Sequence, residues 1–164
     1  MQHPLVKAAV TLSLFVGVTV HAQGVRHEKN ISLDLATQIA AQAVATCTAN
    51  GYAVTATVVD RAGTVRAVQR ADDSGPHTID SSRLKAYTAA SAKESTLAMM
   101  ERVQKNPAAA NLAHIPGYLL LGGGVPVKVG NDVIGAVGVG GAPGGHLDEQ
   151  CAVAGIAKVQ SQLK

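Results

Sequence analysis

Residues 122–151 hold two short β-branched runs, a turn between them and a glycine-rich corner after them. The runs flank Gly130-Asn131-Asp132, whose residues tolerate positive φ angles, so they predict a β-hairpin. Glycine recurs through the second run, which indicates that another backbone or a ligand approaches that strand closely. Pro143 then ends the strand, while Asp148 and Glu149 are typical of the first turn of a helix. A strand, a tight corner and a helix start are therefore expected to meet at one point.

The corner offers backbone N–H groups that can bind an anion. Its candidate residues are Gly140, Gly141, Gly144 and Gly145. Neither the GxGxxG pattern of dinucleotide-binding loops nor the GxxxxGK pattern of phosphate loops is present. We favour a tight strand-to-helix turn here, with an anion site as the alternative.

The N-terminus has the pattern of a secretory signal peptide. A polar start precedes an apolar stretch from Ala8 to Val20, and His21-Ala22 completes a small-x-small cleavage site. The stretch is shorter than the ~20 residues that a membrane helix needs, so we expect no membrane anchor. The expected divisions are a removed signal peptide (1–22), a flexible N-terminus (23–31) and a single domain (32–164). The protein is accordingly expected to be periplasmic or secreted.

Composition argues against nucleic acid as a partner. The chain has 14 Lys and Arg against 11 Asp and Glu, a formal net charge of +3, which is a weak electrostatic footprint for nucleic acid. With 3 Tyr, 1 Phe and no Trp, it also lacks the rings for base stacking. The core must be built from Ala, Val, Leu and Ile, whose small side chains let helices approach a sheet closely.

Hydrophobic periodicity predicts an α+β domain. Helices are expected from Leu33 to about Asn50, from Thr78 to about Lys105 and from Asp148 to Leu163. Strands are expected over 52–59, 64–70 and 118–121 and in both arms of the hairpin. This order has connections short enough for an antiparallel sheet of about five strands, covered by helices.

The two cysteines are candidates for a disulfide. Cys47 lies near the end of the first expected helix and Cys151 near the start of the last. If these helices lie side by side on one face of the sheet, a bridge between them closes a long loop and contributes about 4 kcal/mol in the chain-entropy model. Spacing alone leaves two buried free thiols as the alternative. No metal site is predicted, because two lone cysteines lack histidines at matching spacing.

No set of catalytic residues is visible, so enzymatic activity stays open. His77, His114 and His146 lie in loops or at helix starts, where a histidine is either a solvated side chain or a ligand. Because imidazole is a common axial ligand of haem, these three are the candidate haem ligands. Arg70 and Lys85 are expected to form a basic rim for carboxylates or haem propionates, with a solvated face as the equal alternative.

Six motifs occur in a characteristic order. They are Asp60-Arg61-Ala62-Gly63, Arg70-Ala71-Asp72, Lys85-Ala86-Tyr87-Thr88-Ala89-Ala90, Gly122-Gly123-Gly124-Val125-Pro126, Ile134-Gly135-Ala136-Val137-Gly138-Val139-Gly140-Gly141 and Asp148-Glu149-Gln150-Cys151-Ala152-Val153-Ala154-Gly155. In this order they resemble the GlcG/HbpS family, also called the haem-degrading domain family, which includes the C-terminal domain of PduO-type proteins. The resemblance spans about Ile31 to Leu163. The chain departs from it at Asp73, where many relatives have glycine, so this loop is expected to differ.

The resemblance implies a profilin-like α/β/α sandwich with five antiparallel strands. With the element order above, this places the N- and C-terminal helices on one face. It also implies homo-oligomers, and exported relatives that bind haem, degrade it in the presence of peroxide or report redox state to a sensor kinase. Our leading hypothesis is therefore an exported haem-binding protein. The alternatives are a binding module for a small anionic metabolite or corrinoid-related ligand, and an accessory partner of the outer domain of a membrane sensor kinase.

Overall fold

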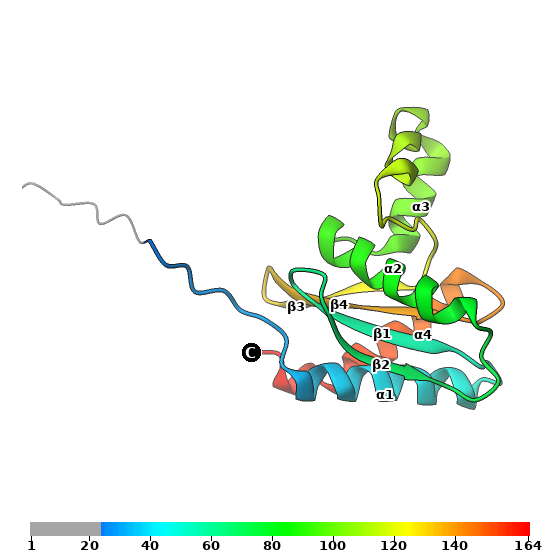
Figure 1. Cartoon of the computed structure of the whole chain (residues 1–164), viewed down its shortest axis with the longest axis horizontal. Coiled ribbons are helices and arrows are strands. Elements are labelled where there is room, and N and C mark those ends of the chain that lie inside the picture. The colour runs from blue at the N-terminus through cyan, green and yellow to red at the C-terminus, as the bar shows by residue number, and fades with distance from the viewer. Residues whose placement is uncertain (1–23) are drawn as a thin grey trace, which may run out of the picture.

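The computed structural model describes residues 24–164 (Figure 1). The expected signal peptide (1–22) and its cleavage site lie outside these residues. In chain order the elements are α1 (Leu33–Ala49), β1 (Thr55–Asp60), β2 (Val65–Arg70), α2 (His77–Ala92), α3 (Thr96–Lys105), η1 (Pro107–His114), β3 (Gly124–Val129), β4 (Asp132–Gly140), α4 (Gly145–Lys158) and η2 (Gln160–Gln162). Within the described part of the chain, every helix is too short or too polar to cross a membrane.

The strands form one antiparallel sheet in the order β2-β1-β4-β3, with α2 on one face and α1 and α4 on the other (Figure 1). This three-layer α+β arrangement confirms the predicted fold class and the placement of the two terminal helices. The predicted hairpin is also present, because β3 and β4 are joined by Gly130 and Asn131, and Gly130 has a φ of 59°.

The fifth predicted strand, residues 118–121, is absent from the described sheet, which has four strands. The backbone of this segment bonds to side chains instead of to a neighbouring strand. Leu119 N–H donates to Thr88 Oγ1 at 2.8 Å, and the Thr96 hydroxyl donates to the Leu121 carbonyl at 2.7 Å. The prediction was wrong because four apolar residues in a row do not reveal that threonines will satisfy their backbone.

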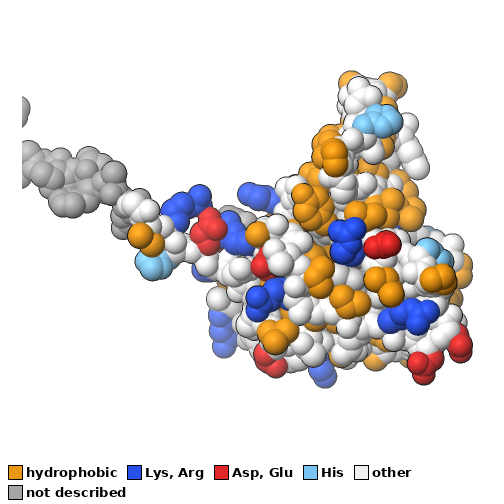
Figure 2. All heavy atoms as spheres, viewed as in Figure 1, with side chains coloured by type: hydrophobic (Ala, Val, Ile, Leu, Met, Phe, Trp, Pro, Cys, Tyr) orange, Lys and Arg blue, Asp and Glu red, His pale blue; other side chains and the backbone are white. Residues whose placement is uncertain are grey.

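The single long helix predicted over 78–105 is two helices, α2 and α3. Lys93 ends α2 with a left-handed φ of 59°, and Ser95 caps α3 by accepting a bond from Ala98 N–H at 3.2 Å. After this break, α3 and η1 stand out from the sandwich as an arm (Figure 1). Apolar side chains gather over the arm and the surface next to it in the space-filling view (Figure 2).

Very small residues allow α2 to lie directly on the sheet. Gly138 in β4 faces the α2 backbone so closely that a Cβ atom at this position would overlap the Ser82 carbonyl oxygen and lie 2.5 Å from Ala86 N. Two buried hydroxyl pairs tie the same surfaces together, Thr55 with Thr78 and Thr57 with Ser82, each at 2.7 Å. The glycines of this strand predicted that another backbone or a ligand comes close to it. The structure shows that it is the backbone of α2.

A disulfide joins the two helices on the other face. Cys47 of α1 and Cys151 of α4 are bonded, with Cα atoms 5.6 Å apart, and both residues are almost completely buried. Gly155 brings the helices close, because a Cβ atom there would lie 2.6 Å from the Ile39 carbonyl oxygen. Of the two alternatives for the cysteines, the structure shows the bridge.

Candidate functional site

Two glycine-rich segments, residues 122–124 and 140–145, meet at one end of the sheet. There β2 and β4 end and β1 begins, since Thr55 pairs with Arg70 on one side and with Gly140 on the other. The helices α2 and α4 start at this end, on opposite faces of the sheet (Figure 1). We call this region the glycine-rich end, and it comprises residues 122–124, residues 140–145 and the first turns of α2 and α4.

A buried ion pair lies beneath the glycine-rich end. Lys85 Nζ of α2 donates to Asp148 Oδ2 of α4 at 2.8 Å and to the Val139 carbonyl at 2.9 Å. The Ala142 N–H donates to the other carboxylate oxygen of Asp148 at 3.0 Å. The side chains of Lys85 and Asp148 are only 2% and 4% exposed. Gly123 leaves room for the pair, because a Cβ atom there would lie 2.8 Å from Asp148 Cβ and 3.0 Å from Lys85 Nζ.

Burial raises the pKa of the Asp148 carboxyl above its usual value of 3.8, because desolvation penalises the charged form, while the charge and hydrogen bond of Lys85 act in the opposite direction. The pair ties a helix on one face of the sheet to a helix on the other. Removing one partner would leave a buried charge without compensation, whereas the intact pair fixes the relative position of α2 and α4.

Lys85 therefore does not stand on an exposed basic rim, and the prediction of that rim was wrong for this residue. It is 1% exposed, and its ammonium group is already bound by Asp148. The sequence contains both residues in separate motifs, but their 63-residue separation gives no signal that they pair. Only the fold reveals the contact.

The structure places His77 and His146 at the glycine-rich end. Each is exposed, in the first turn of α2 and α4 respectively. Their rings fold back over the preceding loops, so that Cβ atoms at Gly75 and Gly144 would lie 2.7 Å from the imidazole Cε1 atoms. Neither helix has a side-chain cap at its N-terminus, and the N–H groups of Thr78, Leu147 and Asp148 donate to loop carbonyls instead.

Arg70 also lies at this end, where its guanidinium donates to the Ser74 carbonyl in the loop before α2. The residue before Ser74, Asp73, has a left-handed φ of 62°, a conformation that glycine adopts without strain. His114 is elsewhere, at the exposed end of η1 on the arm. The glycine-rich end thus brings together His77, His146, Arg70 and the four corner glycines, with Lys85 buried below them and His114 apart.

Two buried side-chain oxygens in the described residues lack a hydrogen-bond partner, Ser74 Oγ and Glu149 Oε2. Ser74 precedes α2 by three residues, and Glu149 is in the second turn of α4. Both residues lie next to the glycine-rich end in the sequence. Such orphaned groups are uncommon in folded proteins.

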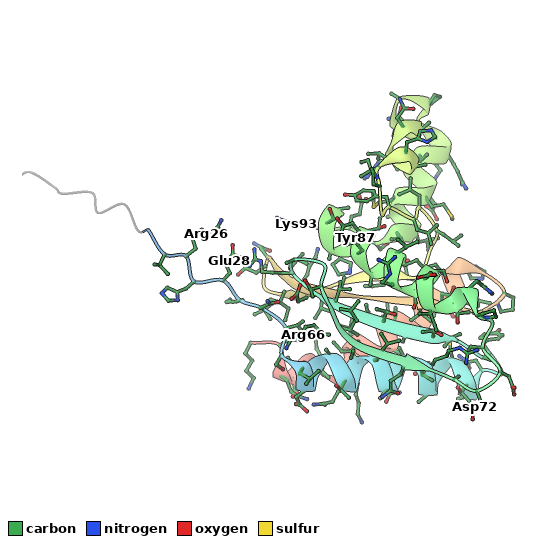
Figure 3. The ribbon with its side chains drawn as sticks, in the orientation of Figure 1. Arg26, Glu28, Arg66, Asp72, Tyr87 and Lys93 are labelled. Carbon is green, nitrogen blue, oxygen red and sulfur yellow. A yellow bond between two sulfur atoms is a disulfide. The ribbon has the colours of Figure 1, made fainter. Side chains whose placement is uncertain are left out.

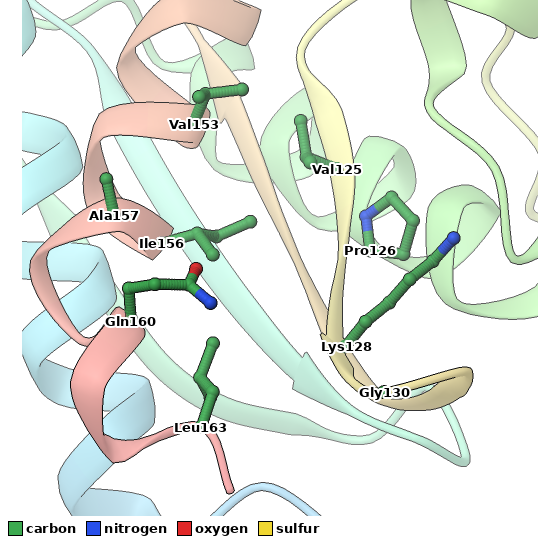
Figure 4. Close-up of a pocket in the computed structure, with 9 residues that line it drawn as sticks. All are labelled: Val125, Pro126, Lys128, Gly130, Val153, Ile156, Ala157, Gln160 and Leu163. Carbon is green, nitrogen blue, oxygen red and sulfur yellow. The ribbon is translucent and has the colours of Figure 1, made fainter.

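Two surface cavities of residues 24–164 lie away from the histidines. The first is a groove of about 420 Å³ between β3 and α4 (Figure 4), with walls that include Val125, Val153 and Ile156 and with Lys128 at one side. A second, of about 480 Å³, is lined by Tyr52 and Asp72 among others. Neither cavity contains a histidine.

A third cavity of about 130 Å³ is lined by Arg61, Ala62, Gly63, Tyr87 and Ser91. The sequence patterns did not predict this cavity. Residues 24–164 contain no cluster of three or more His, Cys, Asp or Glu side chains suited to a metal ion.

A family model described as "Haem degrading protein HbpS-like" matches residues 31–157. The chain is 36% identical over 109 residues to Protein GlcG of Escherichia coli K12, which covers 66% of this chain and 80% of GlcG. It is 37% identical over 86 residues to an uncharacterized 15.0 kDa protein of Citrobacter freundii. That match covers 51% of this chain and 61% of the relative, so the chain aligns with somewhat less than two thirds of that protein.

Solved structures resemble the fold closely. Streptomyces reticuli HbpS, in a structure of a double mutant, has a TM-score of 0.78 and 36% identity over 88% of this chain and 97% of HbpS. Klebsiella pneumoniae ORFY has a TM-score of 0.80 and 30% identity over 86% of this chain and 98% of ORFY. PduOC, solved as a haem complex, has a TM-score of 0.70 over 79% of this chain and 94% of its own, but at 23% identity it supports the fold alone.

Proposed function

This chain belongs to the family of haem-degrading HbpS-like proteins, and from that premise we propose that it binds haem. The structural observation that carries the proposal is the pair of exposed imidazoles, His77 and His146, at the uncapped N-terminal ends of α2 and α4.

The donor set of this chain fits haem in kind. Haem iron in proteins is held by His, Cys, Met or Tyr side chains. Both cysteines are consumed in the disulfide, and Met99 is 2% exposed in the core. The exposed histidines can offer an imidazole nitrogen to the haem iron. Because the described cavities contain none of them, we place the haem on the surface of the glycine-rich end or between subunits.

The residues around the two imidazoles suit the propionates of haem. Carboxylates bind favourably at helix N-termini, and the starts of α2 and α4 have no side-chain caps. Arg70, which is exposed, adds a guanidinium. In this proposal His77 or His146 holds the iron, while Arg70 and the helix ends hold the propionates. Bound haem would supply the redox chemistry with peroxide.

Titration of the full chain with haemin tests this proposal. We expect saturable binding with a Soret band that shifts when His77→Ala or His146→Ala removes the ligand. The matched control is His114→Ala, which removes an exposed histidine on the arm and is expected to leave the band unchanged. Absence of saturable binding would overturn haem binding, whereas a change in His114→Ala alone would move the site to the arm.

We further propose export to the periplasm or the medium. The buried Cys47–Cys151 disulfide supports it, because such bonds form and persist mainly in oxidising compartments. Expression of the full chain in a bacterial host and N-terminal sequencing of the periplasmic fraction test it. A mature N-terminus at Gln23 agrees with the proposal, and retention of the intact chain in the cytoplasm contradicts it.

We also propose that the chain forms homo-oligomers. With haem bound, it would degrade the haem in the presence of peroxide and report redox state to a sensor kinase. Exposed apolar residues on and beside the arm, such as Ile115 and Leu121, at 41% and 42% exposure, support a contact between protein surfaces. Light scattering tests the oligomer, and loss of the Soret band on addition of peroxide tests degradation. Pull-down of a kinase outer domain under oxidising and reducing conditions tests signalling. A monomer would reject the oligomer, a Soret band that is stable in peroxide would reject degradation, and no captured kinase domain would reject signalling.

A further inference from the structure

The small cavity between the β1–β2 turn and α2 has the chemistry of an anion site. Its volume is about 130 Å³, and Arg61 is the one charged residue that lines it in the described chain. Tyr87 and Ser91 also line it, and Ala62 adds a methyl group. The Ser91 hydroxyl is paired with the Tyr118 hydroxyl at 2.9 Å. A water molecule occupies about 30 Å³ of liquid, so this space suits a ligand of a few non-hydrogen atoms and excludes a porphyrin.

The surrounding structure holds Tyr87 rigidly. Its ring lies between Gly63 in the β1–β2 turn and Gly117 in the segment before β3. Cβ atoms at these glycines would lie 2.7 Å and 3.1 Å from opposite edges of the ring, and both glycines have positive φ angles. The turn itself is fixed by Asp60, whose Oδ1 accepts bonds from Ala62 N–H at 2.9 Å and Thr64 N–H at 3.0 Å. The cavity wall is thus preorganised.

Arg61 has donors to spare. Its guanidinium carries five N–H groups. One Nη1–H donates to the Lys29 carbonyl at 3.2 Å, and Nε lies 3.4 Å from Glu28 Oε2. The Arg61 backbone N–H is also held, by Asn30 Oδ1 at 3.2 Å. The N-terminal segment therefore anchors Arg61 from one side, and at least the Nη2 donors are left for a ligand.

A carboxylate is already the partner that Arg61 selects within the chain. Glu28 lies in the N-terminal segment (Figure 3), where its Oε1 pairs with Arg26 at 2.6 Å and its Oε2 lies 3.4 Å from Arg61 Nε. The side chains of Arg61 and Glu28 are 29% and 36% exposed. A ligand carboxylate in the cavity would share the guanidinium with Glu28 and be repelled by it. Glu28 would therefore weaken the binding of an anion, and its neutralisation would strengthen it.

We propose that this cavity binds a short monocarboxylate, with the carboxylate on Arg61 and the remainder of the ligand against Tyr87, Ser91 and the Ala62 methyl group. The site is separate from the glycine-rich end and independent of haem. Its size limits the ligand to about two or three carbon atoms, and its single positive charge selects a monoanion over a dianion.

Calorimetric titration of the full chain with acetate at constant ionic strength tests the proposal. We expect saturable binding that weakens about tenfold or more in Arg61→Gln, since a hydrogen bond to a charged group contributes about 1.5–3 kcal/mol. Tyr87→Phe is expected to weaken it several-fold, and Glu28→Gln to strengthen it. Benzoate, which is too large for the cavity, is expected not to bind.

Arg66→Gln is the matched control. Arg66 is an exposed arginine in β2 (Figure 3) that does not line the cavity, so acetate binding is expected to stay unchanged. Circular dichroism checks that each variant is folded. If Arg61→Gln unfolds the chain, the opposite effects of Glu28→Gln and Tyr87→Phe still decide the question. No saturable acetate binding, or equal effects of Arg61→Gln and Arg66→Gln, would overturn the proposal, and neither result bears on haem.

Discussion

At the scale of single residues, the contact between Lys85 and Asp148 distinguishes this chain most clearly from an ordinary small-residue core. A lysine that is 1% exposed is costly to bury unless its charge is compensated, and here Asp148 and the Val139 carbonyl compensate it. The pair is a weak source of net stability but a strong determinant of geometry, because the alternative is an unpaired buried charge.

Lys85→Met is expected to lower the free energy of unfolding by about 3–5 kcal/mol, because it leaves the Asp148 carboxyl buried without its partner. The double variant Lys85→Met/Asp148→Leu should recover much of this loss. Arg83→Met serves as a control, since the Arg83–Asp80 pair is exposed and 3.8 Å apart, and is expected to change stability by at most about 1 kcal/mol. Urea unfolding measures all three, and equal losses in Lys85→Met and Arg83→Met would contradict the account.

The raised pKa of Asp148 predicts a pH dependence of stability. A carboxyl whose pKa is higher in the folded state binds its proton more tightly there, so its contribution to the free energy of unfolding is greatest below 3.8 and declines as pH rises through the folded-state pKa. The stability of the wild type relative to Asp148→Asn should therefore fall with increasing pH across this window. Urea unfolding at several pH values measures it, and a difference that rises with pH would refute the assigned direction.

At the scale of elements, close contact between α2 and the sheet follows from glycine in β4. Gly138→Ala is expected to destabilise the fold by about 1–3 kcal/mol or more, because the added methyl group overlaps the Ser82 carbonyl of α2. Gly24→Ala is the control, since nothing lies within 4 Å of its Cβ position. Thermal unfolding compares the two variants, and an unchanged midpoint in Gly138→Ala would show that α2 does not press on the strand.

Local patterns predicted α1, the β3–β4 hairpin, the corner and α4, because periodicity and turn residues act over a few positions. The same patterns did not reveal the break at Lys93 and Ser95, although Ser95 is a good helix cap, since apolar spacing continues across it. They also suggested a strand at 118–121, where threonine side chains replace a partner strand. The Lys85–Asp148 contact and the cavity at Arg61 depend on distant segments, so they required the fold.

At the scale of the whole molecule, one covalent bond and one ion pair connect the layers. The disulfide holds α1 to α4 on one face, and the Lys85–Asp148 pair holds α4 to α2 on the other. The glycine-rich end, with its two helix starts, is therefore braced from both sides. Rigid support of this kind suits a surface whose side chains must contact a bound group in a fixed geometry.

Replacing both cysteines by alanine is expected to lower the free energy of unfolding by about 4–5 kcal/mol in the chain-entropy model, because the bond closes a loop with a sequence separation of 104. The replacement should leave the far-ultraviolet circular dichroism of the folded state unchanged. Urea unfolding of the oxidised wild type and the double variant measures the difference. A double variant as stable as the wild type would mean that helix packing alone joins α1 and α4.

Haem binding at the glycine-rich end is the central claim, and a haemin titration followed by absorbance tests it most directly. We expect a saturable Soret band in the wild type that is altered by His77→Ala or His146→Ala and retained in His114→Ala. A chain that gives no saturable band, or keeps the same band after loss of both His77 and His146, would contradict it.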